Sequence, residues 1–149
     1  MAMYQHILLA VDFFEHDQIV IDRAKALAAS YQAKLSLIHV VDNTPMVDAG
    51  YGDMPYPIDL GNELMAIAQA KLHKLAAALA VAEADIWLES GSAHQEIVRV
   101  AQEQQADLLV VGSHGRHGLA LLLGSTANSI LHHARCDVLA VRLPDQPAA

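Results

Sequence analysis

The chain has 149 residues, which is enough for one domain of ordinary size and too few for two. Hydrophobic residues make up 54% of it and charged residues 17%, so it is neither a disordered nor a collagen-like chain. Its net charge of −8 argues against nucleic acid or an anionic membrane as the main partner, because both attract positive charge. We expect one domain over residues 1–149, with a frayed tail over 143–149.

Two absences bear on the cellular compartment. The single cysteine, Cys136, cannot form an internal disulfide, which argues against a secreted fold held by disulfides. No segment has the roughly 20 consecutive apolar residues of a membrane span, and the N-terminus lacks the pattern of a signal peptide. We therefore expect a cytoplasmic protein that is not embedded in a membrane.

Short aliphatic runs alternate along the chain with segments of helical periodicity. Runs that are apolar throughout predict strands buried on both faces, whereas alternating polarity predicts a strand near a sheet edge. The apolar runs span residues 6–11, 35–41, 108–111 and 138–141, and the alternating run spans 84–90. Apolar stripes with spacings of three and four predict helices around residues 20–31, 64–79, 97–101 and 127–134.

Two helix starts have recognisable signals. Ser92 and Gln95 have the spacing of a capping box, in which each side chain accepts a hydrogen bond from the other residue's main-chain N–H. Ser125 can cap the last helix. The alternation of strands and helices predicts parallel pairing with right-handed crossovers, and hence a doubly wound α/β sheet.

Two connections are long and rich in glycine or proline, residues 42–59 and 112–123. Long loops in compact domains are usually functional. Residues 42–59 leave the second strand at the edge where ligands bind in such sheets. Their glycines and prolines predict a segment more mobile than the sheet, which could act as a lid.

The second loop contains three glycines, Gly112, Gly115 and Gly118, and leads to a helix start near Ser125. Glycines let main-chain N–H groups approach a ligand, and a helix N-terminus adds free donors. Arg116 adds a fixed cation. Together they predict a cradle for an anion, most naturally phosphate, and the alternative is a loop that only turns the chain. The sequence has neither a Walker A loop nor a dinucleotide fingerprint.

Asp12 follows the first predicted strand and so lies at the ligand edge of the sheet. Its carboxylate could contact a nucleobase or ribose, approach a metal ion through water, or cap a helix that begins near Phe14. The position alone does not separate these roles.

Nine histidines raise the question of a metal site. Two close pairs, His114 with His117 and His132 with His133, have no carboxylate or thiol at ligand spacing, so we expect no structural metal. His39 lies within an apolar strand, which favours a hydrogen-bonded core histidine. Cys136 is interpreted as a small apolar side chain.

Five segments, taken in order, resemble the universal stress protein family over nearly the whole chain. They read HILLAVD, LSLIHVVD, ADLLVVGSHGRHG, LLLGSTAN and CDVLAV. The resemblance implies a five-stranded parallel sheet of order 3-2-1-4-5 with four helices, which is a Rossmann-like, adenine-nucleotide alpha hydrolase-like fold. It also implies a homodimer, joined here through residues 138–143, and a role in surviving stress. Many members bind ATP or a related adenine nucleotide, and no one reaction is common to the family.

The resemblance also implies where a nucleotide would bind. Asp12 matches the aspartate that contacts the base, and Val40 matches the residue whose main chain meets the adenine. The glycine motif matches at both ends, but the eight residues from Arg116 to Leu123 are one fewer than in nucleotide-binding members. Phe14 stands where many relatives have a serine, which removes a helix cap.

We therefore expect ATP or AMP as the ligand, with Mg²⁺ or Mn²⁺ held through its phosphates. The shorter loop predicts a narrower cradle and an affinity no better than micromolar. The candidate binding residues are Ala10, Val11, Asp12, Val40, Gly112, His114, Gly115, Arg116, Gly124, Ser125 and Thr126.

Three functions compete at this point. The first is a stress protein that binds an adenine nucleotide and is at most a slow ATPase, because no general base or activating lysine is evident. The second is a dimeric stress protein that binds no nucleotide and acts through protein partners. The third is a hydrolase using Asp12, His114 and His117 around a phosphate, for which steady turnover lost in His114→Ala would be the evidence.

Overall fold

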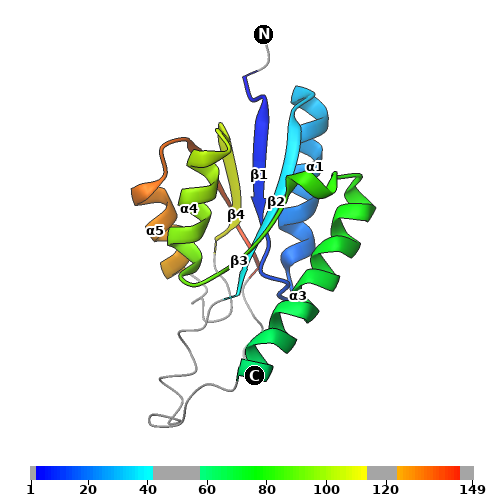
Figure 1. Cartoon of the computed structure of the whole chain (residues 1–149). Coiled ribbons are helices and arrows are strands. Elements are labelled where there is room, and N and C mark those ends of the chain that lie inside the picture. Colours follow the sequence, from blue (N-terminus) through cyan, green and yellow to red (C-terminus); the bar gives the residue numbers. More distant parts are fainter. Residues whose placement is uncertain (1–2, 42–57, 114–123, 145–149) are drawn as a thin grey trace.

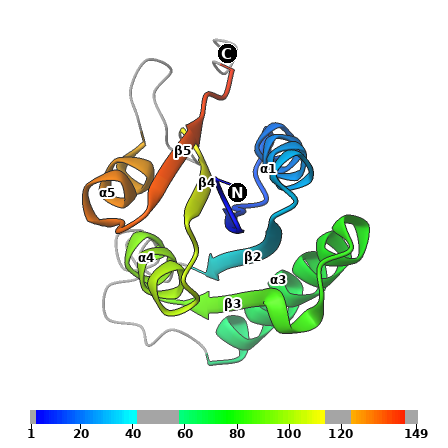
Figure 2. The same ribbon diagram turned by 90° about the horizontal axis from the view of Figure 1, so that it is seen from above.

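The computed structural model describes residues 3–41, 58–113 and 124–144. Five parallel strands form one sheet of order β3-β2-β1-β4-β5, with helices on both faces (Figures 1 and 2). The strands are β1 (His6–Ala10), β2 (Lys34–Val41), β3 (Ile86–Ser90), β4 (Leu108–Gly112) and β5 (Asp137–Val141). The helices within the described residues are α1 (Asp17–Tyr31), α3 (Ile58–Leu79), α4 (Ala93–Glu103) and α5 (Ser125–His133), with a 3₁₀ turn η1 (Glu83–Asp85). The predicted fold class and strand order are confirmed.

Both faces of the central strands are buried. Leu9 belongs to a core that α1 and α3 cover, whereas its neighbour Leu8 belongs to a second core under α4 and α5. Both side chains are fully buried. Strands covered in this way need apolar residues at every position, which is why β1 and β4 lack alternation.

The edge strand β3 is shorter than predicted. Ala84 and Asp85 belong to η1, where the Asp85 amide donates to the carbonyl of Ala82 at 2.9 Å, and β3 begins only at Ile86. The Asp85 side chain also pairs with Lys34 at 2.8 Å. Alternating polarity continues through a single 3₁₀ turn, so it does not mark the point at which a strand begins.

The predicted cap residues do not cap. Ser92 does lie at the N-cap of α4, but its Oγ is 3.2 Å from Nδ1 of His94, and no side chain bonds the free N–H groups of the helix. The N-cap of α5 is Gly124, and Ser125 is the first residue inside the helix. The capping pattern therefore located the helix starts to within a residue without forming the predicted bonds.

Two leucines assigned to buried stripes are exposed, Leu64 at 37% and Leu131 at 44%. Leu64 lies in the second turn of α3, which begins at Ile58. Leu131 follows the buried Ile130, and one residue turns the side chain by about 100° around the helix. In the part of the chain that the structure describes, no helix is long and apolar enough to span a membrane.

Three helices end in the same way and none with glycine. Gln32, Ala80 and Gln105 follow α1, α3 and α4 in the left-handed conformation, with φ of 53°, 55° and 56°. After α1, the amide of Ala33 donates back to the carbonyl of Ala28 at 2.9 Å, which satisfies an end carbonyl of the helix.

Candidate functional site

The sheet has its switch point between β1 and β4. The two strands pair directly, yet the chain leaves β1 toward α1 on one face and reaches α5 on the other face after β4. Crevices of this kind lie at the carboxyl ends of parallel strands and are where ligands bind in open α/β sheets. The residues around this point are therefore the candidate site.

The turn after β1 presents Asp12 to solvent. The Val11 amide continues the ladder by donating to Ile38 at 3.0 Å, and Asp12 itself is exposed. Its Oδ1 accepts the Phe14 amide at 3.0 Å, which closes a tight turn. Asp12 does not cap a helix at Phe14, because α1 begins only at Asp17. The base-contacting and water-mediated roles remain predictions.

Asp17 lies behind this turn and was not predicted as a site residue. It is only 8% exposed, and its Oδ2 accepts the amide of Phe13 at 3.0 Å. Phe13 has a φ of 60°, a left-handed conformation that costs free energy in a bulky residue. Burial, and secondarily the charge of Asp12, raise the pKa of Asp17 to about 7. A carboxylate at a helix start is ordinarily exposed, so sequence reasoning had no signal for its burial.

His39 supports the same turn from β2. Its Nδ1 lies 2.7 Å from the carbonyl of Val11, so Nδ1 carries the proton and donates it. The ring of Phe13 packs on that of His39, with centroids 4.8 Å apart. Burial lowers the pKa of His39, which keeps the ring neutral. The predicted hydrogen bond of His39 is confirmed, although the side chain is half-buried and not fully within the core. Val40 follows it at the carboxyl end of β2.

The end of β4 and the start of α5 meet beside this turn. The Ser113 amide donates to Val141 at 2.8 Å, and the carbonyl of Ser113 accepts the Gly124 amide at 2.7 Å. Ser125 and Thr126 are exposed in the first turn of α5, where no side chain caps the helix. Their N–H groups and the positive end of the helix dipole are therefore available to an anion.

The structure brings together part of the predicted set. Ala10, Val11, Asp12, Val40, Gly112, Gly124, Ser125 and Thr126 all lie at the carboxyl ends of β1, β2 and β4 or at the start of α5. His114, Gly115 and Arg116 lie outside the described residues, as does the predicted lid over most of its length, although α3 already begins at Ile58.

The titratable residues that the structure describes form no metal centre. Within the ranges 3–41, 58–113 and 124–144, no group of three or more His, Cys, Asp or Glu could hold a metal ion. Cys136 is half-buried against the core of α4 and α5, and burial raises its pKa, which suits a small apolar side chain.

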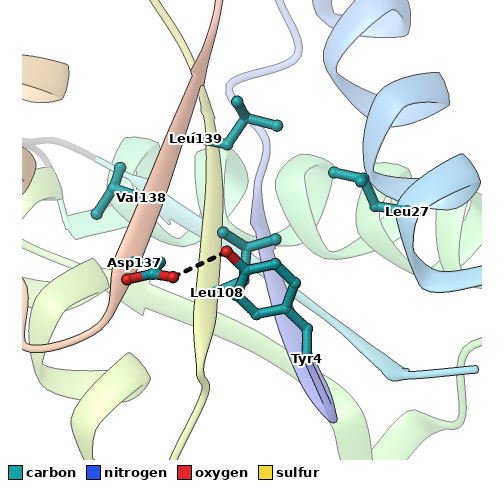
Figure 3. Close-up of a pocket in the computed structure, with 6 residues that line it drawn as sticks. All are labelled: Tyr4, Leu27, Leu108, Asp137, Val138 and Leu139. Carbon is teal, nitrogen blue, oxygen red and sulfur yellow. Dashed lines mark hydrogen bonds between the residues drawn. The ribbon is translucent and has the colours of Figure 1, made fainter. Parts of the chain in front are cut away.

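A hollow lies at the opposite end of the strands, beside the edge strand β5. It has a volume of about 380 Å³ and is lined by Tyr4, Leu27, Leu108, Asp137, Val138 and Leu139 (Figure 3). The hydroxyl of Tyr4 donates to Oδ2 of Asp137 at 2.8 Å across it. Leu108 and Asp137 are the first residues of their strands, so this hollow is separate from the carboxyl edge. Sequence reasoning did not predict it.

Comparison with known proteins agrees with this architecture. The model of the "Universal stress protein family" matches residues 3–142. The chain is 41% identical over 138 residues to universal stress protein A homolog 1 of Coxiella burnetii, covering 93% of this chain and 96% of that protein. It is 38% identical over 144 residues to homolog 2 of the same organism, covering 96% and 98%.

Solved structures share the fold over nearly the whole chain. The hypothetical protein MJ0577 has a TM-score of 0.80 at 27% identity, covering 97% of this chain and 99% of that one. UspA from Lactobacillus plantarum has a TM-score of 0.76 at 26% identity, covering 95% and 100%. A universal stress protein in complex with cAMP has a TM-score of 0.58 at 27% identity, covering 93% and 96%.

The fold and its switch-point edge define a doubly wound, Rossmann-like α/β protein of the kind that binds ligands beyond its strand ends. With these matches, the chain belongs to the universal stress protein family.

Proposed function

We propose that this chain acts in the stress response by binding an adenine nucleotide, ATP or AMP, between the turn after β1 and the start of α5. The observation that carries the proposal is the placement of exposed Asp12 and the uncapped first turn of α5 on either side of the switch point. A related protein of the same fold has been solved with cAMP, which supports an adenine ligand.

Each end of the ligand would meet a different chemistry. The carboxylate of Asp12 accepts a hydrogen bond from an amino or hydroxyl group, and the main chain at Val40 borders the base. The N–H groups of Ser125 and Thr126 face the phosphates, where charge-assisted bonds are strongest. Gly112, Gly115, Gly124, His114 and Arg116 complete the proposed cradle.

A divalent cation would enter with the nucleotide. Because the described residues offer no three-ligand group, Mg²⁺ or Mn²⁺ would be held through the phosphates. It would also offset the net protein charge of −8, which opposes the approach of a polyphosphate.

Proline at the first position of α5 tests the phosphate contact. Ser125→Pro removes one N–H, yet proline suits this position, and Gly124 already has the extended dihedrals that precede proline, φ −61° and ψ 155°. We expect calorimetry to show ATP binding weakened about tenfold, from the loss of one charge-assisted bond. Ala93→Pro, at the same position of α4, is the matched control and should bind as the wild type does.

Two results would count against the proposal. Equal affinities for Ser125→Pro and wild type would contradict the proposed contact between the phosphates and the first turn of α5. If calorimetry shows no heat of binding with ATP, AMP or cAMP at millimolar concentration, the protein does not bind an adenine nucleotide.

The second candidate function is a homodimer that acts through protein partners. It is favoured by β5, whose half-buried Val138, Leu139 and Ala140 form a sheet edge with no pairing strand on its outer side among the described residues. An uncovered apolar edge is an aggregation hazard unless another strand pairs with it. We propose a second copy of the chain as that partner.

A further inference from the structure

The carboxyl group of Asp17 is buried, which disfavours its ionised form. It is the one acidic or basic side chain that is buried among the residues the structure describes. A buried carboxylate needs a cation or several hydrogen-bond donors to remain ionised. Two main-chain amides, that of Phe13 at 3.0 Å and that of Asp12, donate to its side chain, but these bonds lower its pKa less than burial and the charge of Asp12 raise it.

The titratable groups beside Asp17 and beside its neighbour Phe13 do not neutralise its charge. Asp12, from the same turn, adds a second negative charge. His39 from β2 is kept neutral by burial and donates Nδ1–H to Val11 instead. Lys71 from α3 is exposed, with Nζ 5.8 Å from the centre of the Phe13 ring. The pKa of Asp17 is therefore raised to about 7, so that its protonated and ionised forms are both populated near neutral pH.

The protonated form connects the two carboxyl groups. One oxygen of Asp17 accepts the Phe13 amide, and its hydroxyl can donate to Asp12. Asp12 is then fixed through Asp17 as well as through its bond to the Phe14 amide. The proton thus supports both the left-handed turn at Phe13 and the direction in which Asp12 faces.

We propose that Asp17 is a positioning residue whose proton holds Asp12 in the orientation that binds the base, so that nucleotide binding is coupled to protonation of Asp17. This inference rests on the proposed function. When the proton leaves, the two carboxylates repel each other and the turn at Phe13 loosens. An anionic ligand then also meets one more negative charge.

The test compares wild type with Asp17→Asn, whose amide mimics the protonated acid by accepting from Phe13 and donating to Asp12. The probe is cAMP, because its phosphodiester does not titrate near neutral pH. From about pH 6 to about pH 8.5, wild-type affinity should fall, by up to about tenfold per pH unit above the pKa. Asp17→Asn should keep its affinity throughout. Asp22→Asn, an exposed change on the same helix, should follow wild type.

Unfolding in denaturant gives a second readout that needs no ligand. A carboxyl group whose pKa is raised in the folded state stabilises the protein at low pH. That contribution is lost as the pH rises from the pKa of the unfolded state through the pKa of the folded state. Wild type should therefore lose stability relative to Asp17→Asn as pH rises through about 7.

The possible outcomes separate the two proposals. Parallel affinity profiles for wild type and Asp17→Asn would overturn the role of Asp17 while leaving nucleotide binding in place. If the free energy of unfolding has the same pH dependence in wild type and Asp17→Asn, Asp17 does not carry the proposed proton. Absence of cAMP, ATP and AMP binding in every variant would overturn the proposed function, and this inference with it.

Discussion

The carbonyl of Ser113 accepts a hydrogen bond from the amide of Gly124 at 2.7 Å. This bond fixes both ends of the ten residues 114–123 at one point beside the sheet. Ser113 is itself held, because its amide donates to Val141 and its Oγ accepts the Leu143 amide at 3.1 Å. The start of α5 is therefore placed by the ends of the loop and not by the loop's length.

One residue inserted between Gly118 and Leu123 should therefore tighten nucleotide binding without moving α5. It would restore the loop length that the family resemblance implies for nucleotide binding and give the chain more freedom to surround phosphates. Calorimetry with ATP should show a higher affinity than wild type, and thermal unfolding should be nearly unchanged. If the longer loop binds while wild type gives no heat at millimolar ATP, the shorter loop has closed the site and the partner-binding function is favoured. If neither binds, the nucleotide assignments are wrong.

Two prolines in β5 should separate dimerisation from folding. The carbonyl of Val141 points toward β4, since it accepts the Ser113 amide, and in a strand alternate residues point the same way. Leu139 therefore pairs with β4, whereas the main chain of Ala140 faces the open edge. Ala140→Pro should give a folded monomer, and Leu139→Pro should unfold the protomer.

Sedimentation and circular dichroism would check both variants. A wild-type protein that is monomeric at micromolar concentration would contradict the proposed dimer.

A lysine at Val141 would not test the interface. Val141 is buried, with an exposed fraction of 2%, so the charge would disrupt the core of the protomer.

His6 should make the protein sensitive to acid. Its Nδ1 lies 3.1 Å from the carbonyl of Gln104 and so carries the proton, and its Nε2 accepts from the buried hydroxyl of Ser36 at 2.7 Å. Burial lowers the pKa of His6 below its ordinary value of 6.5. Its contribution to stability is therefore complete above that value and is lost as pH falls through the folded pKa.

Unfolding in denaturant across mildly acidic pH would measure this effect. His6→Gln should flatten the loss of stability on acidification. His132→Gln, an exposed change on α5, should leave it in place. A curve for His6→Gln that matches wild type would show that His6 is not responsible.

Glycine at the three left-handed helix ends should stabilise the fold. Gln32, Ala80 and Gln105 are exposed, so replacement removes a strained conformation with little loss of packing. Each change to glycine should add about 0.5–1 kcal/mol to the free energy of unfolding. Ala78→Gly, exposed within α3, is the matched control and should cost about 1 kcal/mol. Denaturant titrations that rank Ala78→Gly and Ala80→Gly equally would contradict this reasoning.

The buried strands could be predicted from the sequence, whereas the end of α1 and the burial of Asp17 could not. Strands such as β4 were predictable because burial on both faces requires unbroken apolar runs, and their order followed from the family resemblance. The end of α1 at Tyr31 had no glycine to mark it, since Gln32 adopts the conformation that glycine usually provides. Asp17 could not be predicted as buried, because it lies against a left-handed turn at Phe13 that the local sequence does not encode.

The central position of β1 determines the order in which the sheet can assemble while the chain is being synthesised. This central strand is made before the other four strands of the sheet, and it can pair with β2 once residue 41 has emerged. Its other edge stays unpaired until β4, since Ile7 pairs with Leu108. Before α4 is made, α1 and α3 can cover only one face of the nascent half-sheet, and Leu8 and Ile38 on the other face remain uncovered. A ribosome that stalls before residue 93 therefore leaves an aliphatic surface uncovered, and chaperones or aggregation would compete for it.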